Sequence, residues 1–413
     1  MTDIPAWYKQ TEIGIIPNDW NVSNITNSFS MKARIWWQWL RTDEYLNNWN
    51  YYLITWQDFD NWKIWWDNCY YVDKKRYDQD KHIQIKPLDV LVTKDWTIGK
   101  VAFIDSMTKP ATLNSWVFVL RTKNASVYQK FFYYLLSSFY FDNFMSQITA
   151  GSTIVHLYQK DFVKFDHIVP TYKEQKEIAN ALSDMDELIS NLDKLIIKKK
   201  NIKESMVQKL LSPKDWWTEV KLKDVAKRVI VWLATSVTQH YREKWIPIFR
   251  NLNIKENYLD DSDILFLEDR YANSQTSKMI HTWDVLTVHT WYVWISCIVP
   301  EKYDNCLTFT TLITTLKEQE VDNKYFCYFC NSTRWLKRIE NLTTQWWRQN
   351  LNSNDFINLE ISIPPTLEEQ KEIATILSDM DKEIEALEQK KIKYENIKIW
   401  AIQKLLTWKI RLV

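Results

Sequence analysis

The chain has 413 residues, of which 46% are hydrophobic and 25% charged, and its formal net charge is +1. This length predicts two or three globular units, and the hydrophobic fraction excludes a disordered chain. No apolar run approaches the ~20 residues that a membrane helix needs, and no signal peptide is recognisable. Five cysteines without a framework spacing fit a reduced, cytoplasmic protein. The near-neutral charge gives no global signature of nucleic-acid binding.

Tryptophan and glycine occur in unusual numbers, 24 and 3. Ordinary usage of ~7% glycine predicts about 29 glycines in a chain of this length. This number is close to the sum of the tryptophan and glycine counts. Several tryptophans also follow Asn or Asp where a turn favours glycine, as at Trp49, Trp62 and Trp96. The pattern suggests the hypothesis that many of these tryptophans are UGA codons read as glycine, as in some uncultured bacterial lineages. The alternative is a truly tryptophan-rich protein.

The first part of the chain has the signals of a mixed α and β domain. Runs of β-branched and aromatic residues predict strands at residues 51–55, 89–93, 101–104 and 117–120. A turn over residues 94–100 joins the second and third of these strands. The compact apolar run at residues 131–136 predicts a buried helix.

A long amphipathic helix is predicted next, beginning after Pro170. Its apolar residues recur with a 4-3 spacing, which is a heptad seam and needs a partner helix. The seam positions are Ile178, Leu182, Met185, Ile189 and Leu192.

The second half of the chain repeats the first. Residues 170–211 and 365–406 are identical at roughly 24 of 42 positions, at a constant offset of 195 residues. The same offset aligns the segment at 89–91 with that at 284–286, both Asp-Val-Leu. The second seam consists of Ile373, Leu377, Met380, Ile384 and Leu387. Lysines interrupt the two seams at Lys199, Lys203, Lys391 and Lys398.

These observations predict the α+β fold class, with two tandem globular domains that are each followed by a long helix. The two helices are expected to pair as an antiparallel coiled coil, because two copies of nearly one sequence most simply pair with each other. The predicted parts are residues 1–170, 171–212, 213–365 and 366–413. The alternative is that each helix packs as an ordinary amphipathic helix on its own domain.

The repeated motif resembles a known family. Pro-x-x-x-Glu-Gln-Lys-Glu-Ile at 170–178 and 365–373, closed by Gln-Lys-Leu-Leu, resembles the conserved helices of type I restriction-modification specificity subunits. The end at 405–411 is similar to the family's Leu-Leu-Thr-Gly-Lys-Ile-Arg, with Trp408 in place of glycine. The resemblance implies that residues 1–170 and 213–365 are target-recognition domains 1 and 2, and that the helices are conserved spacers.

The resemblance implies a non-catalytic, sequence-specific DNA-binding subunit in which each domain reads one half of a bipartite site. The implied partners are double-stranded DNA, two methyltransferase (M) subunits and, through the complex, motor-nuclease (R) subunits. No cofactor or metal is expected in this subunit, because S-adenosylmethionine, ATP and Mg would be bound by the partner subunits.

Candidate DNA contacts are polar and basic residues on predicted turns, whose side chains suit phosphates and base edges. In the first half they are Lys94, Thr97, Lys100, Ser152, Thr153 and His156. In the second half they are His289, Thr290, Tyr292, Gln345, Arg348, Gln349 and Asn350. For any single one of them, a solvated loop residue is an equal alternative.

Two other classes of function are alternatives. An enzyme with its own methyltransferase activity would need an Asn/Asp-Pro-Pro-Tyr/Phe motif, and the only Pro-Pro, at Pro364, is followed by Thr366. A coiled-coil scaffold protein without DNA contacts would leave the duplicated globular domains unexplained. The pair Cys327 and Cys330 has metal-like spacing but no second pair, which favours buried cysteines. The lysines at 198–200 and the acidic residues around 184–187 and 379–381 are expected to face solvent.

Overall fold

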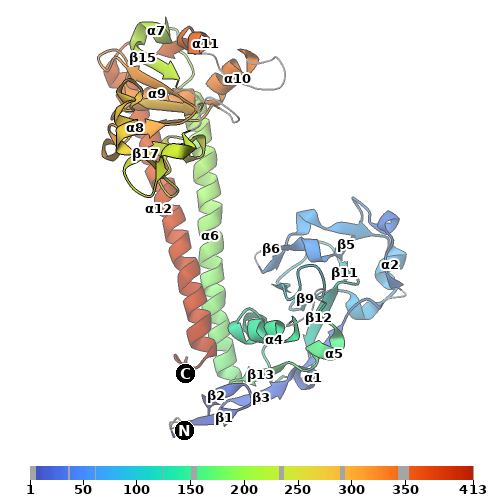
Figure 1. Cartoon of the computed structure of the whole chain (residues 1–413). Helices are drawn as coiled ribbons and strands as arrows, with labels where there is room; N and C mark the ends of the chain where they lie inside the picture. The colour runs from blue at the N-terminus through green and yellow to red at the C-terminus, as the bar shows by residue number, and fades with distance from the viewer. Residues whose placement is uncertain are drawn as a thin grey trace. The chain divides into compact units, whose positions relative to one another are not determined.

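The computed structural model describes residues 6–35, 38–60, 62–123, 125–149, 156–231, 237–288, 294–342 and 353–412. The chain forms two compact units: unit 1 is residues 1–191 with 390–413, and unit 2 is residues 192–389. Two long helices, α6 (Tyr172–Leu210) and α12 (Leu367–Leu406), each contribute one part to each unit (Figure 1).

Unit 1 is built on an antiparallel sheet with the strand order β10-β9-β12-β4. Its strands are β4 (Phe29–Lys32), β9 (Val90–Thr93), β10 (Val101–Phe103) and β12 (Val117–Thr122). A second sheet has the order β11-β5-β8, with strands β5 (Tyr51–Ile54), β8 (Tyr70–Val72) and β11 (Ala111–Leu113). The paired short strands are β1 (Tyr8–Thr11) with β2 (Gly14–Pro17), β3 (Asn21–Asn24) with β13 (Asp166–Val169), and β6 (Phe59–Asp60) with β7 (Lys63–Ile64).

The central sheet of unit 1 is buried on both faces, which explains its nearly continuous apolar strands. Val90 and Val92 of β9 pack in the cluster that contains the helix α3 (Gln129–Leu136). Leu91, between them, packs in the cluster of the second sheet. The other helices are α1 (Ile25–Ser28), α2 (Lys74–Asp78), α4 (Phe139–Thr149) and α5 (Gln159–Phe162). The predicted strands and the predicted buried helix of this half are therefore confirmed.

Unit 2 repeats this plan. Its central antiparallel sheet has the order β15-β24-β21-β22, with strands β15 (Ala226–Val231), β21 (Val285–Val288), β22 (Ser296–Ile298) and β24 (Thr311–Leu316). The second sheet is β16 (Tyr241–Arg242), β20 (Leu265–Leu267), β17 (Ile246–Phe249) and β23 (Leu307–Thr308). The paired short strands are β14 (Thr218–Lys221) with β25 (Glu360–Ile363) and β18 (Ile254–Lys255) with β19 (Tyr258–Leu259).

Helices cover the central sheet of unit 2 as well. The buried one is α9 (Asn323–Cys330), and the others are α7 (Leu222–Val225), α8 (Asp269–Asn273), α10 (Thr333–Leu342) and α11 (Ser353–Ile357). Short 3-10 helices complete both units: η2 (Thr42–Glu44), η3 (Trp56–Asp58), η4 (Trp66–Asn68), η5 (Lys81–Ile83), η6 (Thr238–His240), η7 (Asn251–Asn253), η8 (Thr276–Lys278) and η9 (Glu301–Tyr303).

The predicted pairing of the two long helices is present within each unit, and it is antiparallel. In unit 1, Ile178 and Leu182 of α6 pack in one cluster with Ala401 and Leu405 of α12. In unit 2, Ile373 and Leu377 of α12 pack in the cluster against which Val207 and Leu210 of α6 lie. The predicted seam residues Leu192 and Ile384 are also buried, whereas Met185, Ile189, Met380 and Leu387 are half-buried.

Ion pairs accompany this helix pairing in unit 2. Lys199 pairs with Glu383 at 2.6 Å, and Lys200 pairs with Glu388 at 2.7 Å. Lys198 and Lys200 are exposed and Lys199 is half-buried, so the run keeps the expected solvated face while two of its members also reach carboxylates of the opposite helix.

A tyrosine, an aspartate and a lysine meet at the same place in each unit, and we call this group the Tyr–Asp–Lys node. In unit 1, Asp186 of α6 accepts a hydrogen bond from the Tyr134 hydroxyl at 2.7 Å and pairs with Lys398 at 2.5 Å.

In unit 2, Asp381 of α12 accepts a hydrogen bond from Tyr328 at 2.7 Å and pairs with Lys203 at 2.5 Å. Each node joins the buried helix of a domain to both long helices. The expectation that Asp186 and Asp381 face solvent is wrong, because each is shared by two partners. The nodes also explain why two lysines, Lys203 and Lys398, interrupt the apolar seams, because each pairs with the aspartate of a node.

The Glu-Gln pair of the repeated motif fixes the start of each long helix. Glu174 is buried and accepts a hydrogen bond from the indole of Trp20 at 2.9 Å. Arg411 binds the same carboxylate at 2.5 Å and Asp19 at 2.7 Å, and this contact lowers the pKa of Asp19. Gln175 accepts the backbone N–H of Tyr128 at 2.7 Å.

The same arrangement occurs at the start of α12 in unit 2. Glu369 accepts the indole N–H of Trp217 at 3.2 Å and contacts Lys214 at 3.3 Å. Gln370 accepts the backbone N–H of Asp322 at 2.8 Å. The motif is therefore structural, since it fastens each helix to the domain that precedes it.

Two further expectations concern cysteines and membranes. Cys327 and Cys330 are buried in α9, as predicted. Among the described residues, no group of His, Cys, Asp and Glu is placed to hold a metal ion. Within the same part of the chain, no helix has both the length and the apolar character needed to cross a membrane.

A buried histidine makes the stability of unit 1 depend on pH. His167 of β13 is fully buried between Phe29 and Phe132, and this burial lowers its pKa from 6.5 to about 4. The contribution of the neutral His167 to the free energy of unfolding is fully present above pH 6.5. It is lost as the pH falls toward 4, and the loss amounts to up to about 3 kcal/mol. The position equivalent to His167 in unit 2 is Ile361, which is also buried.

We therefore expect His167→Ile to remove this acid sensitivity. Urea unfolding at pH 7 and pH 5 measures it, with the wild-type chain as the reference. An equal loss of stability in both proteins would show that other groups control the acid response.

Candidate nucleic-acid interface

The turn between β9 and β10 holds three of the predicted DNA contacts, and its backbone is closed by Thr93. The N–H of Thr93 donates to the carbonyl of Lys100 at 2.9 Å, and Gly99 donates to the carbonyl of Thr93 at 3.0 Å. The buried Thr93 hydroxyl donates to the carbonyl of Thr97 and accepts the N–H of Lys100 at 3.0 Å. Gly99 has a φ of +78°, and a Cβ there would lie 3.3 Å from Met145, so this position needs glycine.

The two lysines of this turn face different surroundings. The Lys94 ammonium donates to the carbonyl of Ser115 at 3.1 Å and lies 4.8 Å from the centre of the Phe118 ring. Burial lowers the pKa of Lys94. Lys100 is exposed, and Thr97 is half-buried. Of the two predicted lysines, Lys100 is thus the one available to a phosphate, while Lys94 supports the turn from inside.

The fourth described candidate of this half, His156, is fastened to the same turn. Its imidazole contacts the carboxylate of Asp95, which is buried. The next residue, Leu157, donates its N–H to the carbonyl of Lys94 at 2.8 Å. The structure therefore brings Lys94, Thr97, Lys100 and His156 together. Ser152 and Thr153 lie outside the described residues.

Unit 2 presents a hairpin with the same register. Val285 pairs with Ile298 and Thr287 with Ser296, as Val90 pairs with Phe103 and Val92 with Val101. The candidates of this half all lie outside the described residues: His289, Thr290, Tyr292, Gln345, Arg348, Gln349 and Asn350.

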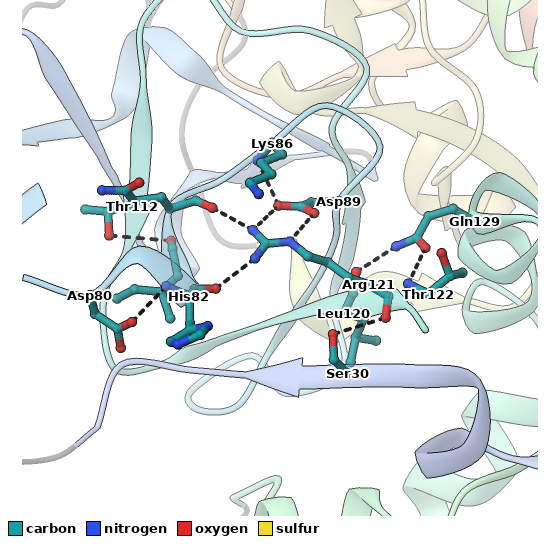
Figure 2. A network of polar contacts seen from close by, with 12 residues as sticks. Ser30, Asp80, His82, Lys86, Asp89, Thr112, Leu120, Arg121, Thr122 and Gln129 are labelled. Carbon is teal, nitrogen blue, oxygen red and sulfur yellow. Dashed lines mark hydrogen bonds and ion pairs between the residues drawn. The ribbon is translucent and has the colours of Figure 1, made fainter. Parts of the chain in front are cut away.

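A buried ion pair holds the segment that leads into the hairpin of unit 1 (Figure 2). The Asp89 carboxylate is bound by Arg121 through two bonds of 2.7 Å and by the backbone N–H of Lys86 at 2.8 Å. Arg121 also donates to the carbonyls of His82 at 2.9 Å and Gln84 at 2.5 Å. Since Asp89 directly precedes β9, this network, the Asp89–Arg121 pair, fixes where the hairpin starts.

The Asp284–Arg228 pair does the same in unit 2. Asp284 accepts bonds from Arg228 at 2.8 Å and from the backbone N–H of His281 at 2.9 Å. Arg228 also donates to the carbonyl of Met279 at 3.1 Å. The aspartate and the backbone groups that it fixes follow the offset of the sequence repeat.

The arginine does not follow that offset. Arg121 stands on β12 opposite Ser30 of β4, whereas Arg228 stands on β15 opposite Thr315 of β24. Strands β12 and β24 are equivalent, and so are β4 and β15. The arginine therefore occupies opposite members of the same cross-strand pair in the two units. Sequence reasoning found the repeated Asp-Val-Leu but missed both arginines for this reason.

The comparison with known proteins agrees with this duplicated architecture. The family described as "Type I restriction modification DNA specificity domain" matches the chain twice, over residues 17–200 and 213–395. The chain belongs to the type I restriction-modification specificity (S) subunits. As such it is a non-catalytic, DNA-specificity component of a type I restriction-modification complex.

Named relatives cover most of this S subunit. It is 25% identical over 354 residues to the type I restriction enzyme MjaVIII specificity subunit of Methanocaldococcus jannaschii, spanning 80% of this chain and 81% of the relative. It is 24% identical over 422 residues to the putative MjaX specificity subunit of the same organism, spanning 98% and 96%.

A solved structure shares the fold of this S subunit. The S subunit of a type I restriction-modification system from M. genitalium matches with a TM-score of 0.58 at 14% identity, covering 94% of this chain and 96% of that chain.

The exchanged arginine gives a direct test of the two Arg–Asp pairs. Arg121→Thr leaves the buried Asp89 carboxylate without its cation, and we expect it to lower the free energy of unfolding by about 3 kcal/mol. Adding Ser30→Arg recreates the arrangement of unit 2 and should restore most of this loss. Urea unfolding of the three proteins measures the effect.

The matched control is Arg242→Thr, which breaks the exposed pair with Glu268. This change should cost less than about 1 kcal/mol. A double variant no more stable than Arg121→Thr would mean that the two cross-strand positions are not interchangeable.

Proposed function

We propose that each globular domain of this S subunit reads one half of a split DNA site. Residues 1–170 would read one half and residues 213–365 the other. The observation that carries the proposal is the duplicated hairpin, which has the same register in both units and is held by the same kind of buried Arg–Asp pair. A reading element needs such fixed backbone, because a base contact tolerates little displacement.

The proposed contacts of domain 1 are Lys94, Thr97, Lys100, Ser152, Thr153 and His156. Lys100 supplies an exposed cation suited to a phosphate. Ser152 and Thr153 lie close to His156 in sequence. In domain 2 the proposed contacts are His289, Thr290, Tyr292, Gln345, Arg348, Gln349 and Asn350. Arginine, glutamine and asparagine are the side chains that form bidentate contacts with guanine and adenine.

The long helices would set the separation of the two half-sites. In each unit the Tyr–Asp–Lys node ties one domain to both helices. A domain held in this way keeps one orientation on the helix pair, and half-site spacing on DNA follows protein geometry.

The catalytic partners are also part of the proposal. Two methyltransferase (M) subunits would bind S-adenosylmethionine, and motor-nuclease (R) subunits would use ATP and Mg. The S subunit itself would hold no cofactor and would act in the cytoplasm, where the DNA is.

The exposed Lys100 of the first hairpin makes the DNA contact testable. We expect Lys100→Ala to weaken binding of the S–M complex to its duplex several-fold at ~0.1 M salt and to reduce the salt slope by about 1. Fluorescence anisotropy across a salt series measures both. Lys164→Ala removes another exposed lysine, which pairs with Asp161, and is the control. An unchanged slope in Lys100→Ala would exclude this lysine as a phosphate contact.

Domain exchange tests the division of labour. The S subunit is expressed with its methyltransferase in a methylation-free bacterial host, and adenine methylation is mapped by single-molecule sequencing. We expect a split motif with two specific halves, and exchange of residues 1–170 for another S subunit's first domain should change one half only. Co-purification without any methylation motif would instead favour a scaffold without DNA contacts.

A further inference from the structure

Five tryptophans have a backbone conformation that L side chains rarely adopt. In the described part of the chain, nine non-glycine residues have positive φ, and five of these are Trp62, Trp96, Trp245, Trp283 and Trp408. Tryptophan contributes only 24 of the 413 residues. Positive φ brings Cβ against the neighbouring carbonyl oxygen, which is costly for a bulky residue and free for glycine.

The turn around Trp62 is one that glycine usually forms. Strands β6 and β7 pair Asp60 with Lys63, and Trp62 directly precedes the second of these paired residues in sequence. Asn-Gly is the strongest sequence signal for a two-residue hairpin loop, since its second residue has positive φ. Trp62 has a φ of 67°. The equivalent hairpin of unit 2, β18–β19, has Asn257 with the same φ of 67°, and asparagine tolerates this conformation.

The end of α12 also has a backbone conformation that glycine usually adopts. Helix α12 ends at Leu406, Trp408 has a φ of 54°, and the N–H of Ile410 donates to the carbonyl of Lys404 at 3.3 Å. A residue of positive φ just past a helix, followed by a bond back to the last turn, is the usual place of glycine.

Most of the rings at these positions face solvent, and the exception is Trp408, which is half-buried and packs against Trp20. Four of the five rings are exposed: Trp62 by 41%, Trp96 by 76%, Trp245 by 64% and Trp283 by 48%. Trp20 and Trp217 differ in every respect, because both are buried and both donate their indole N–H to a glutamate at the start of a long helix. Trp20 and Trp217 therefore use their indole N–H groups, whereas the five tryptophans of positive φ have a backbone conformation that favours glycine.

We propose that glycine occupies positions 62, 96, 245, 283 and 408 in the protein that the native cell makes, and that Trp20 and Trp217 are tryptophan there. The UGA hypothesis, drawn from composition, thereby becomes an assignment of individual codons. Leu88 is equivalent to Trp283 and has a φ of 73°, so the copy of this site in unit 1 accepts a side chain. The codon of Trp283 is therefore the most informative of the five.

The assignment has a consequence at position 96 that rests on the proposed function. Trp96 lies in the turn between β9 and β10, and its exposed ring stacks on Trp56 with the ring centroids 6.2 Å apart. Glycine at 96 leaves the backbone of this turn open to close approach, which is one of the uses of glycine at nucleic-acid and phosphate sites.

The gene sequence and the native protein decide the assignment. We expect UGA at the five positions and UGG at Trp20 and Trp217, and mass spectrometry of peptides from the native cells should show glycine at the former and tryptophan at the latter. UGG at the five positions, or tryptophan in those peptides, overturns the proposal.

Recombinant variants test the physical reason independently of the codons. Trp62→Gly, Trp245→Gly and Trp408→Gly should each raise the unfolding midpoint by about 4 °C. Trp217→Gly, the matched control, should lower it by at least as much. Midpoints that fall in all four variants would contradict the backbone argument.

Position 96 is tested by function. In the methylation map, Trp96→Gly should sharpen base discrimination at the half-site read by domain 1 and leave base discrimination at the other half unchanged. If the codon is UGA but base discrimination does not change, the glycine assignment stands and the role of this turn in DNA reading is refuted.

Discussion

The structure depends on a simple electrostatic constraint: a carboxylate removed from water needs donors that replace its hydration. Each half buries an aspartate before its central hairpin, Asp89 or Asp284, and binds a glutamate at the start of its long helix, where Glu174 is buried and Glu369 is half-buried. The donors come from segments distant in sequence, so meeting the constraint folds loop, sheet and helix onto one another. Hydrophobic burial supplies most of the driving force, but these polar contacts decide which segments meet and in which register.

The sequence predicted the parts of this molecule whose signals are periodic or repeated. The heptad seams, the internal repeat and the buried strands each follow from spacing along one segment, and the helix pairing followed because two similar seams need a partner. The hairpin at 94–100 was located correctly as well, since strand residues flank it on both sides. On this turn Lys100 is exposed and Lys94 is turned inward, a difference that the spacing of the two lysines does not predict.

What the sequence could not give were contacts whose partners do not share a spacing. Arg121 and Arg228 perform one task from two different strands, so no alignment of the halves pairs them. Asp186 and Asp381 were recognised as equivalent, yet their tyrosine and lysine partners lie on other helices, and only tertiary packing brings these together. The tyrosines themselves, Tyr134 and Tyr328, are separated by one residue less than the helical repeat. An acidic side chain on a predicted helix surface carries no local sign that it will be covered.

Arg411 has a consequence for the order in which the units are completed. Unit 2 is one continuous stretch, residues 192–389, whereas unit 1 needs residues 390–413 in addition to residues 1–191. On the ribosome, unit 2 therefore has all of its residues while the Glu174 carboxylate still lacks its arginine. A frameshift or premature stop after codon 389 would damage the unit that contains residues 1–191 and spare the unit that directly precedes the lesion. Genetic defects in this subunit should thus be mapped by unit rather than by their position along the gene.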